Sequence, residues 1–248
     1  MRLSVQKALT AFALAGCLAM PAHVAETKPL TTPAGKMPLV HWAVLRAKPG
    51  AMREMMGMAA RNVAPLSAQE PGTYALYGGM DKRAPNVVRL LEIYEDEAAY
   101  EAHVGSDGFR KYKEEREPLL EELDILPVDP VVLEQKESGT GADVILRLYA
   151  VKPEHLAAFT TLLAEEMRRG VAEDVGVMGL FATAEQGRAN MIHTYELFAD
   201  EAARASYRNS PAYRAFWEKA RPMLYSSSEV ENLPGKVTLS QKGFHEKR

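Results

Sequence analysis

The sequence predicts an α+β fold made of two similar units that follow one another along the chain. Three observations lead to this prediction. The 248 residues are 47% hydrophobic and 25% charged, which is the composition of a folded soluble protein. From about residue 40 to residue 120, the chain aligns with itself without a gap after a shift of 104 residues. Each copy alternates strand-like and helix-like stretches in the same order.

The repeat is defined by a matched block and by scattered identities in one register. The block Asp96-Glu97-Ala98-Ala99 coincides with Asp200-Glu201-Ala202-Ala203, and 200 − 96 gives the shift of 104. Further identities pair Lys48-Pro49 with Lys152-Pro153, Gly72 with Gly176, Leu76 with Leu180, Asn86 with Asn190, Glu92 with Glu196 and Pro118 with Pro222. A period of this length is that of a domain, not of a solenoid repeat. We predict one domain over residues 38–134, a second over 143–240, and a loop-like linker at about 134–142.

Unit one begins with a strand and then a helix. The helix, expected at 51–64, carries methionines at helical spacing and stops at Pro65. Asp96 and Ser106 are expected to cap a short helix and a second, longer one. The expected strands, rich in aliphatic or aromatic residues, are 39–46, 73–79, 87–95 and 128–133.

Unit two repeats this pattern in the same register. Its expected strands are 144–151, 177–182, 191–198 and 236–239, and its expected helices are 154–170, 200–206 and 210–224. Both units have the order β-α-β-β-α-β, which is that of a ferredoxin-like, split βαβ unit with helices on one face of an antiparallel sheet. The other face of each sheet needs a partner, and the second copy supplies it. We predict two tandem units packed sheet to sheet as one intrachain barrel.

The first 25 residues have the pattern of an export signal. Arg2 and Lys7 precede an apolar run over 8–20 that is too short to span a bilayer comfortably. Cleavage near Ala25 is expected, and a lipobox-like sequence ending at Cys17 leaves lipidation as the alternative. We expect an exported chain, periplasmic or secreted, with no membrane span after processing.

The charge and the cysteine content exclude several classes of function. The chain has 30 Lys and Arg against 33 Asp and Glu, a net charge of −3, and shows no basic stripe for nucleic acid. Its single Cys excludes a disulfide framework and a zinc site built on several thiolates. The sequence shows neither a Gly-rich dinucleotide fingerprint nor a clustered set of His, Cys and carboxylate ligands, so no cofactor and no metal is expected. The last residues, 241–248, form a mostly basic tail.

A string of residues in unit one resembles a known family. It consists of Val44, Pro49-Gly50, Arg61-Asn62, Ser67, Glu70-Pro71-Gly72, Glu92-Ile93-Tyr94, Asp96, Ala99, His103, Phe109 and Tyr112. At these spacings the unit resembles the antibiotic biosynthesis monooxygenase (ABM) family of the dimeric α/β barrel superfamily. The resemblance covers nearly all of the chain after the leader, as two copies. It leaves open whether two such chains associate as a homodimer.

The resemblance implies a cavity between helices and sheet that binds a small, flat aromatic or quinone-like molecule. Several members of the family oxygenate phenols or quinols with O₂ and no cofactor, so a monooxygenase of this type is expected. Two alternatives stay open: a non-catalytic periplasmic binding protein, and a haem-binding or haem-degrading relative. Unit two loses polar residues of the string, with Glu166 at the position of Asn62 and Tyr207 at that of His103. The chemistry is therefore expected in unit one.

Two residues are the catalytic candidates. His103 is expected to act as general base on a phenolic OH, and Asn62 to donate an amide N–H to a developing oxyanion. Each has a structural alternative, since His103 could cap a helix break and Asn62 could be a solvated residue at a helix end.

The substrate-binding candidates are His41, Trp42 and Tyr74. His41 and Trp42 alternate on a strand, so only one of them can face the cavity. Each of the three could instead be an ordinary core residue. Arg89, a charge on a strand, is expected to pair with Glu92.

Overall fold

The computed structural model describes residues 37–136, 141–232 and 238–241. The predicted leader with Cys17, the middle of the predicted linker and the tail beyond Gln241 lie outside these residues. Within them, the duplication is visible element by element.

Unit one contains four strands and four α-helices, which lie where the repeat places them. The strands are β1 (Leu39–Ala47), β2 (Thr73–Met80), β3 (Val87–Tyr94) and β4 (Leu120–Gln135). The helices are α1 (Met52–Asn62), α2 (Ala64–Ser67), α3 (Glu97–Gly105) and α4 (Asp107–Arg116), the last followed by the 3₁₀ turn η2 (Glu117–Leu119).

Unit two repeats this order at the shift of 104 residues. Its strands are β5 (Asp143–Val151), β6 (Val177–Glu185), β7 (Arg188–Phe198), β8 (Leu224–Glu231) and β9 (Thr238–Gln241). Its helices are α5 (Leu156–Glu173), α6 (Glu201–Asn209) and α7 (Pro211–Ala220), with 3₁₀ turns η3 (Pro153–His155) and η4 (Arg221–Met223).

The repeated block caps equivalent helices. The Asp96 carboxylate accepts from the backbone N–H of Ala99 at 3.0 Å, and Asp200 accepts from Ala203 at 2.8 Å. Gly72 is required for a related reason, because a Cβ at this residue would lie 2.5 Å from the Cβ of Ala99. The block therefore fixes the start of α3 and α6, and Gly72 lets α3 pack closely against the start of β2.

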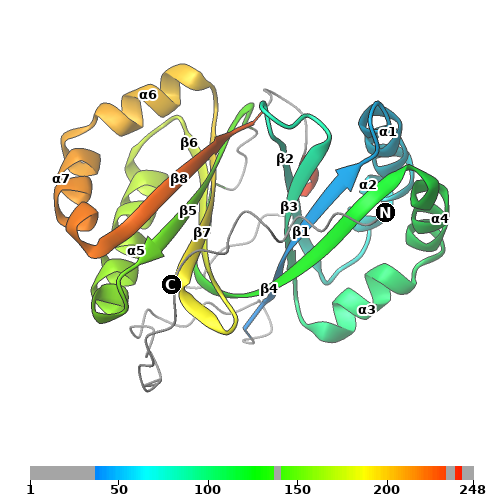
Figure 1. Cartoon of the computed structure of the whole chain (residues 1–248), viewed down its shortest axis with the longest axis horizontal. Helices are drawn as coiled ribbons and strands as arrows, with labels where there is room; N and C mark the ends of the chain where they lie inside the picture. The colour runs from blue at the N-terminus through cyan, green and yellow to red at the C-terminus, as the bar shows by residue number, and fades with distance from the viewer. Residues whose placement is uncertain (1–36, 137–140, 233–237, 242–248) are drawn as a thin grey trace, which may run out of the picture.

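The strands form one nine-stranded sheet in the order β8-β5-β7-β6-β4-β1-β3-β2-β9, and every recorded pairing is antiparallel. Figure 1 shows that it folds into two facing layers with α1–α4 outside one and α5–α7 outside the other. Strand β4 crosses between them, since its first half pairs with β1 and its second half with β6. β9 returns to pair with β2 of unit one. The predicted pair of ferredoxin-like units packed sheet to sheet is confirmed.

The two layers share a core of aromatic and aliphatic side chains. Tyr77 stacks on Tyr195 of the other unit, with ring centroids 5.6 Å apart, and the Tyr195 hydroxyl donates to the Gly78 carbonyl at 3.0 Å. Trp42 donates through Nε1 to the Thr183 hydroxyl at 2.9 Å. These buried polar contacts fix the register of one layer on the other.

The sequence-based prediction missed the first half of the closing strand in each unit. Residues 120–127 belong to β4, and β8 occupies residues that were expected to be a helix end and a loop. Both segments are rich in Glu, Asp or Ser, and consecutive residues in each are exposed, so the alternation typical of a strand is weak. Pro65 does not end the helical region but lies in the first turn of α2.

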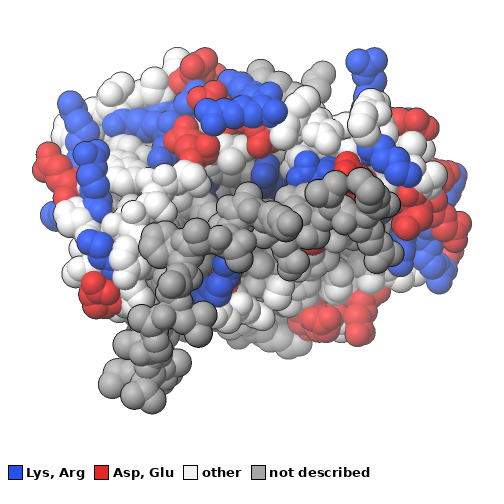
Figure 2. Space-filling model, in the orientation of Figure 1, with Lys and Arg blue, Asp and Glu red and all other residues white. Residues whose placement is uncertain are grey.

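Charges of both signs are interspersed over the described residues of the face in Figure 2. Over residues 37–136, 141–232 and 238–241, no helix is long and apolar enough to cross a membrane.

The shared core predicts that the two units do not separate into independent monomers. Expressed alone, residues 38–134 would expose the apolar face that unit two covers, together with the second half of β4. We expect each half to aggregate or self-associate, and the two halves to form a 1:1 complex when mixed. Analytical ultracentrifugation of each half and of the mixture measures this. Two stable, non-associating monomers would contradict it.

Candidate active site

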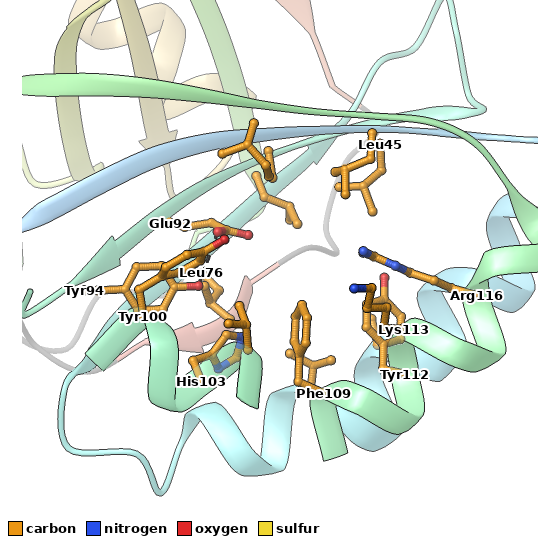
Figure 3. Close-up of a pocket in the computed structure, with 17 residues that line it drawn as sticks. Leu45, Leu76, Glu92, Tyr94, Tyr100, His103, Phe109, Tyr112, Lys113 and Arg116 are labelled. Carbon is orange, nitrogen blue, oxygen red and sulfur yellow. Dashed lines mark hydrogen bonds between the residues drawn. The ribbon is translucent and has the colours of Figure 1, made fainter. Parts of the chain in front are cut away.

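A cavity of about 260 Å³ lies between the sheet and helices of unit one. Strands β1 to β4 supply one wall, and α1, α3 and α4 supply the other. Figure 3 shows polar groups that reach into it from opposite sides, with Glu92 on one side and Arg116 and Lys113 on the other. Aromatic rings of Tyr94, Tyr100, Phe109 and Tyr112 complete the lining.

His103 lines this cavity from the last turn of α3, and only 2% of its surface is exposed. Its Nδ1 lies 2.7 Å from the Glu70 carboxylate, which also accepts from the Thr73 hydroxyl at 2.8 Å. Because a carboxylate only accepts, Nδ1 carries the proton and Nε2 of the neutral ring is left as an acceptor. Phe109 packs edge-on against the imidazole at 5.0 Å and holds its plane. His103 is therefore built like an oriented general base.

Glu92 is the carboxylate inside the cavity. It lies on β3, and the Tyr94 hydroxyl donates to it at 3.2 Å. Burial raises the pKa of Glu92 to about 7, and the Tyr94 hydrogen bond and the charge of Arg116 offset this only in part. Burial also raises the pKa of Tyr94 well above its usual value, so this phenol stays a donor. Near neutral pH, Glu92 can therefore either donate or accept a proton.

Arg116 provides the positive charge of the cavity. It ends α4, is 6% exposed, and its guanidinium lies 5.0 Å from the ring centroid of Tyr112. Its Nε is buried and has no hydrogen-bond partner in the part of the chain that the structure describes. A buried, unpartnered donor is costly, and an anionic or oxyanion-forming ligand would satisfy it.

Larger side chains occupy the inner part of the equivalent space in unit two, and only an open hollow beside Arg147 and Trp217 is found there among the described residues. At the shift of 104 residues, Ala43 and Leu45 correspond to Arg147 and Tyr149. Ala59, Val63 and Lys113 similarly correspond to Leu163, Met167 and Trp217. Each replacement is larger, and three of them, Tyr149, Leu163 and Met167, are buried in the core of unit two.

The carboxylate of unit two is also neutralised. Glu196, the counterpart of Glu92, lies 3.0 Å from Arg147 in an ion pair. Tyr207 stands where unit one has His103, and its ring packs on Tyr213 at 4.8 Å. The combination of a base (His103), an acid (Glu92) and an arginine with an unpartnered Nε (Arg116) around one cavity is therefore found in unit one.

The other predicted site residues lie outside this cavity. The Asn62 amide donates to the Glu115 carboxylate at 3.1 Å and links α1 to α4, so the expected oxyanion contact is not made there. His41 faces the helices but packs edge-on against Tyr100 at 5.0 Å, behind the lining. Trp42 and Tyr74 belong to the core between the sheets.

Residues that sequence reasoning missed carry much of the site. Glu70, Glu92 and Arg116 were not proposed as site residues, although the first two stand in the family-like string. Arg116 could have been found by its spacing, because residues 109, 112 and 116 share one face of a helix. Arg89 does not pair with Glu92. It lies on the opposite face of β3 and contacts Asp81 at 3.4 Å.

Glu92 should make the stability of the protein depend on pH. Its pKa is about 7 in the folded chain against an ordinary value of 4.5, so its stabilising contribution is present at low pH and is lost as the pH rises through 7. Relative to Glu92→Gln, the wild-type free energy of unfolding should fall by about 3 kcal/mol between pH 4 and pH 8. Urea unfolding of both proteins at the two pH values measures this. A difference independent of pH would contradict it.

Across the described ranges, no three His, Cys, Asp or Glu side chains lie close enough together to hold a metal ion.

Comparison with solved structures supports the fold. A candidate monooxygenase of Lactobacillus acidophilus NCFM superposes with a TM-score of 0.78 at 16% identity, over 85% of this chain and 99% of that one. A candidate monooxygenase of Fusobacterium nucleatum subsp. nucleatum gives 0.73 at 16% identity, over 85% and 98%. An anthrone oxidase-like protein gives 0.55 at 10% identity, over 82% and 93%. No curated protein matches the sequence significantly.

The sequence itself matches a family model twice. The model, described as antibiotic biosynthesis monooxygenase, matches residues 38–115 and 144–219. The two matches lie in the two units of the repeat and together span more than half of the chain. The chain therefore belongs to the antibiotic biosynthesis monooxygenase family and carries two tandem copies of its domain.

Proposed function

We propose that the protein is an exported, cofactor-independent monooxygenase that oxidises a small quinol or related phenol with O₂ in the cavity of unit one. The observation that carries the proposal is the contact of 2.7 Å between Glu70 and His103, which holds a buried base at the wall of an aromatic cavity. Family membership supports the reaction class. The export-like leader at residues 1–25 supports the location.

The proposed reaction begins with proton transfer. A substrate hydroxyl directed at His103 Nε2 would lose its proton to the imidazole, and Glu70 would stabilise the resulting imidazolium. Arg116 would hold the phenolate through its unpartnered Nε. The tyrosine and phenylalanine rings would keep water away from the anion, which raises its reducing power toward O₂.

The redox balance needs no external reductant. A hydroquinone and O₂ give a hydroxyquinone and water: one oxygen atom replaces a ring hydrogen as a hydroxyl group, and the other leaves as water. All four electrons taken up by O₂ come from the substrate ring. Glu92, with a pKa of about 7, is placed to supply a proton to the departing oxygen. The anthrone oxidase-like neighbour, which has a similar fold, is likewise named for an oxidation.

The proposal is tested by O₂ uptake of the purified protein after treatment with a chelator. With methylhydroquinone we expect one O₂ consumed per quinol, hydroxyquinone as product, and no requirement for added metal, flavin or nicotinamide. Binding of the quinol without uptake above the protein-free rate would contradict the proposal and indicate a binding protein. A Soret band on titration with haem, together with no uptake, would contradict it in favour of a haem-binding role.

A further inference from the structure

A second cavity lies between the two sheets, away from the proposed reaction site. Its volume is also about 260 Å³, close to the lower end of small-molecule sites. Strands β1, β3 and β4 line it on one side and β5, β7 and β8 on the other. Figure 1 shows these two groups of strands in the two facing layers.

Most of the lining consists of residues that the internal repeat relates to one another. At the shift of 104 residues, eight of its eleven residues form counterpart pairs: Trp42 with Leu146, Val44 with Leu148, Arg89 with His193, and Leu126 with Val230. The hollow therefore lies on the axis that relates the units. An interface kept for packing alone would fill this axis with apolar side chains. Here Arg89 of unit one and its counterpart His193 of unit two border it instead.

The polar contacts around the two basic residues are also counterparts. Arg89 contacts Asp81 at 3.4 Å, and His193 contacts Glu185 at 2.8 Å. Asp81 and Glu185 are themselves related by the shift of 104 residues. Glu185 forms a second ion pair, with Arg188. Asp81 forms an ion pair only with Arg89 among the described residues.

Arg89 is the donor best placed to recognise a ligand. A guanidinium has five N–H donors, and Asp81 accepts from Nη1 alone, at the long end of hydrogen-bond distances. Ser228 adds a hydroxyl group to the lining. The other cation on the border, Arg147, is already held by Glu229 at 2.7 Å.

The rest of the lining is flat and apolar. The Trp42 indole lies 5.9 Å from the His193 ring, and its own N–H is satisfied by Thr183. Aliphatic side chains of β1, β4, β5 and β8 close the remaining walls. Arg147 and the Thr194 hydroxyl are engaged by Glu196, which leaves Arg89 and the Ser228 hydroxyl beside an aromatic wall. These groups suit a ligand with one carboxylate on an aromatic ring.

We propose that this second cavity binds a small aromatic carboxylate, with the carboxylate on Arg89 and the ring against Trp42. The inference stands apart from the reaction assigned to unit one. The chain contains two tryptophans. The variant Trp217→Phe therefore leaves Trp42 as the sole indole reporter of this cavity.

The experiment titrates Trp217→Phe with benzoate and follows Trp42 fluorescence, with calorimetry on the wild-type protein as a second measurement. We expect saturable binding that Arg89→Gln weakens about tenfold or more, as for a lost charge-assisted hydrogen bond. Arg89→Lys should recover part of the loss. Arg116→Gln, in the cavity of unit one, is the matched control and should leave the benzoate-induced change in Trp42 fluorescence unchanged.

Neutral benzamide and cationic benzylamine test the recognition of charge. Both should bind at least about tenfold more weakly than benzoate. Equal binding of benzamide, or tighter binding of benzylamine, would overturn the proposal. So would calorimetric binding that Arg116→Gln abolishes and Arg89→Gln leaves intact, since the ligand would then occupy unit one. Absence of binding at millimolar benzoate by both measurements would also overturn it.

Discussion

Filling the cavity of unit one with the side chains of unit two should abolish turnover. In the double variant Ala59→Leu/Val63→Met, α1 would carry the residues that unit two has at Leu163 and Met167. Ala59 and Val63 both line the cavity, so the added methylenes would occupy the space proposed for the substrate. We expect kcat/KM for a quinol to fall by about 10²-fold or more, since displacement of a bound substrate by about 1 Å already has effects of this size.

Stability separates this result from misfolding. The new side chains enter existing space, so the cost of overpacking should stay below about 3 kcal/mol. Ala60→Leu is the matched control, because Ala60 is the next residue of α1 and is exposed. It should keep both kcat/KM and the melting temperature. Wild-type turnover by the double variant would place the reaction elsewhere.

Loss of the base should be the second large effect. His103→Ala should lower kcat by about 10²-fold or more, the usual size of a lost general base. The Glu70→Gln change keeps the shape of the side chain but removes the charge that orients Nδ1–H, so it should lower kcat and shift the pH dependence of kcat. Rates of O₂ uptake across pH 5–9 measure both.

Asn62→Ala is the control for these two variants. Its amide bonds Glu115 outside the cavity, so kcat should stay within about twofold of wild type. His103 is buried against Phe109, so the melting temperature of each variant must be measured beside its rate. An inactive Asn62→Ala protein with an unchanged melting temperature would restore Asn62 to the catalytic role expected from the sequence.

The fold could be predicted because the duplication repeats strong local signals. Asp96 and Asp200 cap helices by the same contact, and Gly72 and Gly176 both allow a helix to approach closely. The pairing of the last strand of each unit with the other unit, β4 with β6 and β9 with β2, could not be predicted. The pairing of β4 with β6 depends on the placement of the second unit, which no local pattern in residues 120–135 encodes.

The site was predictable only in part. His103 could be predicted because it stands in the family-like string and an imidazole suits a general base, and the structure places it in the cavity. Its partner Glu70 lies 33 residues away in sequence and is brought close by the packing of α3 on β2. Asn62 and Arg116 lie near the ends of packed helices, and a small rotation decides which side chain faces inward. Only the packed structure resolves that choice.

The claim that unit one carries the chemistry is tested most directly by one ratio. It is kcat for O₂ uptake with a quinol in His103→Ala divided by that in Glu166→Gln. Glu166 holds the position of Asn62 in unit two and is paired with Arg169 at 2.7 Å, away from any proposed substrate. We predict a ratio of about 10⁻² or less, with Glu166→Gln close to wild type. A ratio above one, with Glu166→Gln inactive and His103→Ala active, would contradict the account and place the reaction in unit two.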